Sequence, residues 1–239
     1  MGKFFDQNSP LMRFLSRMTD LLWLNVLVLI CCIPIITAGA ALTAMNYVCL
    51  KLVRGKEGYI TTDFFRSFKR NFKQATLIWI VVLLISIILG FDYWYLLFSK
   101  VIETPTWLIV ALGIATLFIL TCVVMIFPVL SHFENTIRGT VKNAFLIGIF
   151  QLPKTVLMIL LWAVPPVFWY LSPRLAPLSW FFWFSLPGYL GALLYHKTFL
   201  RFEPEEAVIT GDMEWTVSVE GDEDVVQESG EVQESQDNT

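Results

Sequence analysis

The chain has 239 residues, of which 56% are hydrophobic and only 15% are charged, whereas an average soluble domain carries about a quarter charged residues. Residues 1–202 hold all 17 Lys and Arg against seven acidic residues, a charge of +10, and residues 203–239 hold 13 acidic residues and no basic ones, a charge of −13. This composition excludes a chain made mainly of soluble domains. It also favours anionic lipid over nucleic acid as the partner of the basic part.

Residues 1–20 predict an amphipathic segment that lies at a membrane interface. Aromatic and aliphatic residues alternate there with Arg13 and Arg17, a mixture typical of interfacial helices. Ser9-Pro10 is a suitable helix start, because proline is tolerated in the first helical turn.

Residues 21–50 form a long apolar stretch that Pro34 interrupts. Proline removes one backbone hydrogen bond, so a helix break is expected there, and Thr37 and Gly39 loosen the helix further. We expect this stretch to cross the membrane once, because each half would rise only about 20 Å against a hydrocarbon core of about 30 Å. The alternative is a re-entrant hairpin, which the basic residues near the N-terminus favour.

Residues 51–73 carry seven Lys and Arg, interleaved with phenylalanines three or four residues apart. This spacing predicts a helix with one apolar and one cationic face. Such a helix lies on a membrane surface that bears anionic headgroups, or packs against its own bundle. The residues of this candidate interfacial helix are Phe64, Phe65, Arg66, Phe68, Lys69, Arg70, Phe72 and Lys73.

Four further apolar stretches follow, at about residues 74–98, 106–131, 153–171 and 177–197. The sequence therefore predicts an all-α, polytopic transmembrane bundle of about five spans within residues 21–202. An acidic tail follows at residues 203–239, where the composition is typical of disorder.

Basic residues in short loops mark the cytoplasmic side of a membrane. Loops 51–73 and 131–154 hold ten Lys and Arg, whereas turns 99–105 and 172–177 hold one each. We therefore expect a multi-pass cell-membrane protein whose two basic loops and C-terminal tail are cytoplasmic.

Polar groups inside apolar stretches are the candidate functional residues, because burying them in lipid is costly. These are Asn25, Asn46 and Asp92, with Pro34, Thr37 and Gly39 as a candidate helix break. Asn25 and Asn46 are expected to form interhelical hydrogen bonds, and Asp92 is expected to be exposed at the interface. No known catalytic motif occurs, and two histidines, His132 and His196, are weak evidence for a metal site. We predict a protein that is not an enzyme and holds no metal or cofactor.

Two segments resemble the YesL-like family of bacterial membrane proteins, whose biochemical function is unknown. They are Ile33-Pro-Ile-Ile-Thr-Ala-Gly-Ala40 and Asp63-Phe-Phe-Arg-Ser-Phe-Lys-Arg-Asn-Phe-Lys-Gln-Ala75, and the resemblance covers about residues 1–202. It implies a multi-span protein, often encoded near genes for carbohydrate uptake and glycan degradation, and it supplies no catalytic residues.

The expected function is that of a non-enzymatic accessory or regulatory component associated with carbohydrate uptake, with a membrane transport or signalling protein as partner. The alternative is a small transporter or a permease-like subunit.

Overall fold

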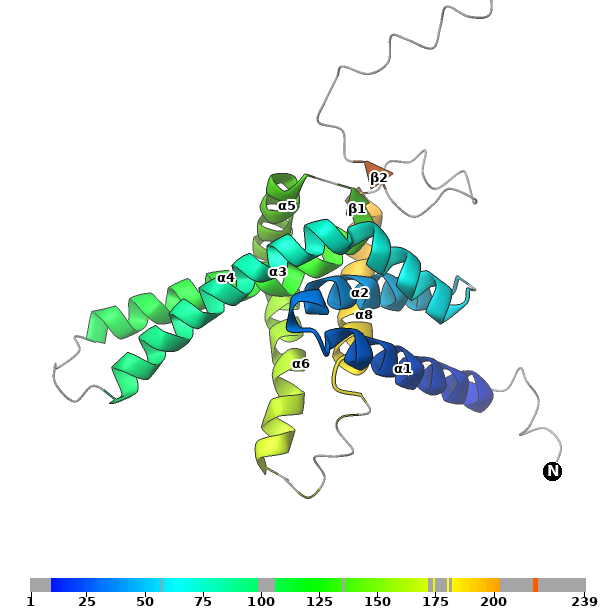
Figure 1. The fold of residues 1–239 in the computed structure, drawn as a ribbon, viewed down its shortest axis with the longest axis horizontal. Helices are drawn as coiled ribbons and strands as arrows, with labels where there is room; N and C mark the ends of the chain where they lie inside the picture. The colour runs from blue at the N-terminus through cyan, green and yellow to red at the C-terminus, as the bar shows by residue number, and fades with distance from the viewer. Residues whose placement is uncertain are drawn as a thin grey trace, which may run out of the picture.

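The structure, a computed structural model, describes residues 10–56, 58–98, 106–134, 136–171, 174, 180, 182–202 and 217–218. These residues are nearly all helical (Figure 1). Within the described part, five helices are long and apolar enough to cross a membrane, which confirms the predicted all-α membrane fold. Residues 1–9 and, apart from Val217–Ser218, the predicted disordered tail lie outside the described residues.

The chain reverses direction between helix α1 (Pro10–Cys32) and helix α2 (Ala38–Val53), at a short 3-10 turn, η2 (Ile35–Thr37). The Arg17 guanidinium, near the start of α1, donates a hydrogen bond to the Leu52 carbonyl near the end of α2. The two helices are therefore antiparallel, as the blue ribbons of Figure 1 show. The predicted single crossing through residues 21–50 is wrong, and the hairpin alternative describes the backbone.

The prediction failed because α1 begins at Pro10 and not near residue 21. Its 23 residues rise about 35 Å, and the 16 residues of α2 rise about 24 Å. Pro10 occupies the first helical position, where its missing amide hydrogen costs nothing. The amphipathic segment predicted for residues 1–20 is therefore not a separate element, since its later half is the first part of α1.

Helix α3 runs without interruption over Ile60–Phe98, 39 residues or about 58 Å. The basic segment and the predicted span at residues 74–98 are thus two sections of one helix. Asp63 lies in the first turn, where a carboxylate interacts favourably with the helix dipole.

Helix α4 (Thr106–His132) and helix α6 (Leu152–Leu171) cover the stretches predicted as 106–131 and 153–171. Between them lie strand β1 (Phe133–Glu134) and helix α5 (Ile137–Phe150), and β1 pairs in parallel with strand β2 (Val217–Ser218). Helix α8 (Ser185–Phe202) begins eight residues later than the predicted span at 177–197. The five candidate spans are α1, η2 with α2, α3, α4 and α6, so α8 is not among them.

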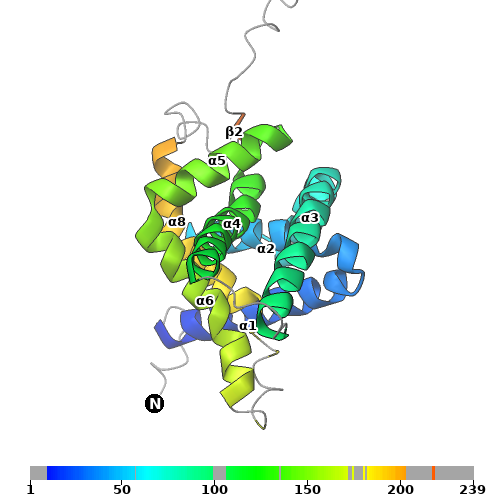
Figure 2. The same ribbon diagram turned by 90° about the vertical axis from the view of Figure 1, so that its left-hand side faces the viewer.

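Helix α2 lies at the centre of the fold, packed against α1, α3, α4 and α8, and Figure 2 shows these four helices around it. Its small residues Ala40, Ala41 and Ala44 are fully buried. A methyl group added at Gly39 would lie 2.5 Å from the Trp79 Cβ atom and 2.7 Å from the Ala75 carbonyl oxygen. Small side chains therefore bring the backbones of α2 and α3 close together.

Candidate functional site

The backbone carbonyls at the helix break around Pro34 accept hydrogen bonds from other groups of the protein. The Thr37 hydroxyl lies 2.6 Å from the Cys31 carbonyl oxygen and 2.8 Å from that of Pro34. The Trp79 indole N–H of α3 donates to the Ile35 carbonyl at 2.7 Å. The first bond satisfies a carbonyl that the end of α1 leaves open, and the other two satisfy carbonyls of the connection to α2. Pro34, Thr37 and Gly39 therefore form a structural joint between α1, α2 and α3.

The tip of this joint is apolar and exposed. Ile33, Ile35 and Ile36 have exposed fractions of 77%, 67% and 59%. An exposed apolar tip between two antiparallel helices suits immersion in hydrocarbon, whereas in water it would be unfavourable.

Asn25 of α1 caps the start of α8. Its side-chain oxygen accepts hydrogen bonds from the backbone N–H groups of Phe184 (3.0 Å) and Ser185 (3.3 Å), and its amide nitrogen donates to the Trp180 carbonyl at 2.6 Å. Free N–H groups at a helix start are commonly satisfied by Asn side chains, here one from a distant helix. The interhelical bonding predicted for Asn25 is present.

Asn46 of α2 borders a central cavity of about 190 Å³. Its Oδ1 atom accepts a hydrogen bond from the Tyr195 hydroxyl of α8 at 3.2 Å, and its Nδ2 atom donates to the Leu42 carbonyl at 2.8 Å. The remaining lining side chains are apolar or aromatic and come from α2, α3, α4, α6 and α8; they include Trp79, Val124, Phe127, Met158 and Trp162. An apolar cavity of about 150 Å³ can stay dry, so this space suits an apolar group better than a sugar.

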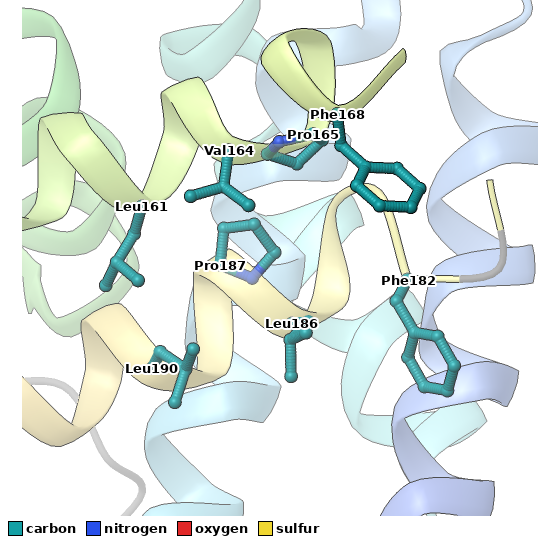
Figure 3. Close-up of a pocket in the computed structure, with 8 residues that line it drawn as sticks. All are labelled: Leu161, Val164, Pro165, Phe168, Phe182, Leu186, Pro187 and Leu190. Atoms are coloured by element: carbon teal, nitrogen blue, oxygen red, sulfur yellow. The ribbon is translucent and has the colours of Figure 1, made fainter. Parts of the chain in front are cut away.

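An apolar groove of about 230 Å³ lies between α6 and α8, and all eight of its lining residues are apolar. Figure 3 shows Val164 and Pro165 of α6 facing Pro187 of α8, with Phe168 and Phe182 at one end. Pro187 also borders the central cavity, so the two spaces lie on either side of the first turn of α8.

The first section of α3 has the predicted two faces. Phe64 is fully buried, and Phe68 and Phe72 pack half-buried against the core, whereas Phe65 is 39% exposed. The four basic residues of the candidate interfacial helix, Arg66, Lys69, Arg70 and Lys73, are all exposed. The apolar face therefore packs against the bundle, and the cationic face points outward.

One ion pair at the α2–α3 connection was not predicted from sequence. The Lys51 ammonium lies 2.7 Å from the Asp63 carboxylate, and the two side chains are 17% and 9% exposed. A methyl group added at Gly58 would collide with both charged groups. The only sequence signal for the pair was an acidic residue at a helix start, twelve positions after a lysine.

The remaining predicted polar sites do not come together. Asp92 is exposed near the far end of α3. His132 stacks on Phe199, with ring centroids 5.3 Å apart, and His196 is bonded to the Leu193 carbonyl. Among the described residues no group of three or more His, Cys, Asp or Glu side chains is arranged to hold a metal ion.

The five long apolar helices and their exposed apolar side chains define a membrane-embedded helical protein. Residues 20–93, which include the second half of α1, all of α2 and most of α3, match a family described as "Protein of unknown function, DUF624". No curated protein and no solved structure matches the chain.

Proposed function

We propose that the protein is a non-enzymatic accessory or regulatory component of the bacterial cell membrane, associated with carbohydrate uptake. The observation that carries the proposal is the exposed cationic face of α3, at Arg66, Lys69, Arg70 and Lys73. This face continues directly into a helix long and apolar enough to cross a membrane. Such an arrangement offers a binding surface to an anionic partner, either headgroups or a transport or signalling protein.

The link with carbohydrate uptake rests on the resemblance to the YesL-like family. The match to the uncharacterised family covers residues 20–93, and both segments that carry the YesL-like resemblance lie inside it. A family of unknown function is compatible with that resemblance.

The hairpin supports a topology with both ends of the chain in the cytoplasm. Because α1 and α2 are antiparallel, the start of α1 lies at the same end of the molecule as the basic connection after Val53. Lys3, Arg13 and Arg17 then fall on the same side as the basic loops, in agreement with the positive-inside rule. The tail then returns to the cytoplasm if α8, which is not among the five candidate spans, crosses the membrane as well as α3, α4 and α6.

Cysteine labelling of intact cells tests this topology. In a variant without native cysteines, a cysteine introduced at position 3 or 56 is expected to resist a membrane-impermeant reagent, and one at position 174 is expected to react. Labelling at position 3 but not at position 56 would contradict the hairpin topology.

A transporter is the second candidate, because the central cavity lies beside a broken helix, as in many transporter sites. Its polar groups, however, already have partners: Asn46 bonds to Leu42 and Tyr195, and the Trp79 N–H bonds to Ile35. A sugar would have to break these bonds or remain poorly hydrogen-bonded, which is costly. The accessory role therefore has the better support.

Glycan uptake in a deletion strain tests the proposed function. Deletion is expected to reduce uptake or its transcriptional response, and wild-type protein is expected to restore it. A variant with Arg66, Lys69, Arg70 and Lys73 changed to Gln, inserted at normal levels, is expected not to restore it, whereas R174Q is the matched control that should. Unchanged uptake after deletion would overturn the proposal, and substrate flux into vesicles holding the purified protein would replace it with the transporter.

A further inference from the structure

The cationic face of α3 has a neighbour that is also basic. Helix α5 exposes Arg138 and Lys142. The two helices are joined by a hydrogen bond of 3.2 Å from the Gln74 side chain, next to Lys73, to the Thr140 hydroxyl. We call the exposed basic residues of both helices the cationic surface: Arg66, Lys69, Arg70, Lys73, Arg138 and Lys142.

The end of α8 and strand β2 both contact the segment that precedes α5. Near the end of α8, Phe199 packs on His132 and Phe133, with ring centroids 5.3 and 5.2 Å away. Further along, Val217 and Ser218 pair with Phe133 and Glu134, immediately before α5. Glu134 precedes Thr140 by six residues, which places β2 at most about 20 Å along the chain from the junction of α3 and α5.

The tail is matched in charge to the surface. Residues 203–239 hold 13 acidic residues and no Lys or Arg. Eight of those acids lie among the 21 residues that follow Ser218, and a linker of about that number of residues spans about 25 Å on average. The basic section from Arg66 to Lys73 is about 11 Å long. It therefore lies within reach of the residues that follow Ser218.

We propose that the acidic tail docks on the cationic surface of its own chain and thereby screens that surface from other anionic partners. Each exposed ion pair contributes at most about a five-fold change in the equilibrium. A tethered tail nevertheless acts at an effective concentration in the millimolar range, so several weak pairs suffice. The contact does not depend on any link with carbohydrate uptake.

Salt is the first diagnostic, because the pairs are exposed. The screening length falls from about 10 Å at 0.1 M to about 3 Å at 1 M salt. Docking is therefore expected at low salt and lost at high salt, whereas contacts of the buried core are insensitive to salt.

Photo-crosslinking of the full-length protein in nanodiscs of neutral phosphatidylcholine tests the proposal. Benzoylphenylalanine replaces Thr62, which is exposed one turn before Arg66, and crosslinked peptides are mapped by mass spectrometry. Crosslinks to residues 219–239 are expected, and their yield is expected to fall at least about five-fold in 1 M NaCl and in the R66Q/K69Q/K73Q variant. The same probe at Phe98, 69% exposed at the far end of α3, is the control and should not reach the tail.

A second measurement separates the tail from lipid headgroups. In a variant whose tail acids after Ser218 are changed to Gln or Asn, the freed surface is expected to bind vesicles containing phosphatidylglycerol more tightly than wild type. Crosslinking at Thr62 that is absent, or that is unchanged by salt and by the Gln substitutions, overturns the proposal. Equal vesicle binding by wild type and the neutral-tail variant also overturns it, because the surface would then be open to headgroups in both.

Discussion

Helices α2, α3 and α4 are each apolar enough to cross a membrane, but α2 and the paired far ends of α3 and α4 differ in their surroundings. In the most apolar 18-residue stretch of η2 and α2, 61% of the residues are buried within the protein, whereas the corresponding share is 17% in α3 and in α4. The far ends of α3 and α4 extend away from the other helices in Figure 1, and they expose large side chains such as Ile87, Phe91 and Trp107.

The comparison shows that two apolar helical regions of one chain are suited to two different environments. In α2, small residues allow close packing against other helices, and the Thr43 and Asn46 side chains form hydrogen bonds. Both features are common between membrane helices. In the far ends of α3 and α4, large apolar residues face outward, where hydrocarbon is the expected environment. Equivalent substitutions should therefore have unequal effects in the two regions.

The largest expected effect is that of Gly39→Ala. The new methyl group would meet the Trp79 Cβ atom and the Ala75 carbonyl, neither of which can move without shifting α3. Overpacking of this kind costs about 3 kcal/mol of unfolding free energy, measurable by reversible denaturation in detergent. Gly188→Ala is the matched control, because its methyl meets the flexible end of Met45; equal losses in both variants would contradict the close α2–α3 contact.

The next effect compares the two ends of α3. Asp63→Asn removes the partner of Lys51 in a largely buried pair, and we expect a loss of about 2 kcal/mol in unfolding free energy. Asp92→Asn, at the exposed far end, should change stability by less than about 0.5 kcal/mol. Adding Lys51→Met to Asp63→Asn should recover part of the loss, because it removes the unpaired charge.

Asn25→Leu is expected to lower the unfolding free energy by about 1.5 kcal/mol. The substitution removes the side chain that accepts hydrogen bonds from the first N–H groups of α8. Proteolysis or hydrogen exchange should show the first turn of α8 opening more often than in wild type. In the paired far ends, Thr116→Val removes the hydrogen bond between the Thr116 and Tyr93 hydroxyls and the bond that Thr116 donates to the Leu112 carbonyl of its own helix. Because that carbonyl keeps its helical position and the Tyr93 contact is exposed, this loss should be smaller. A larger loss for Thr116→Val would reverse the comparison.

The smallest effect is predicted for Gly90→Ala and Gly113→Ala. Both positions are open, with no atom within 4 Å of an added methyl group. Alanine is the better helix former by about 1 kcal/mol, so each substitution should leave stability unchanged or raise it slightly. Destabilisation by either would indicate a close protein neighbour at that face.

Local patterns allowed much of the helical structure to be predicted. The four-residue spacing of Phe64, Phe68 and Phe72 identified the apolar face of α3, and the long apolar runs located α4 and α6. Pro34 identified the break. Each of these signals depends on residues that are close together in the sequence, so each could be recognised without knowledge of the fold.

The joint and the cap depended on contacts between distant residues. The Trp79 indole, 44 residues after Ile35, bonds to the Ile35 carbonyl at the joint, and no local signal around Pro34 predicts that contact. Asn25 was expected to bond to another helix, but its partners lie 155 to 160 residues away. No periodicity identifies such partners, so the cap of α8 and the role of Tyr195 were missed.

The Trp79–Ile35 bond also has a consequence for biogenesis. A chain emerging from the ribosome at about 5 to 20 residues per second makes residue 79 roughly 2 to 9 s after residue 35. During that interval the Ile35 carbonyl at the hairpin tip is bonded only to the Ala38 backbone N–H and lacks its partner from α3, which weakens the hairpin in hydrocarbon. The hairpin is therefore expected to integrate more stably together with α3, so translation arrested before Trp79 should leave it easier to extract from the membrane.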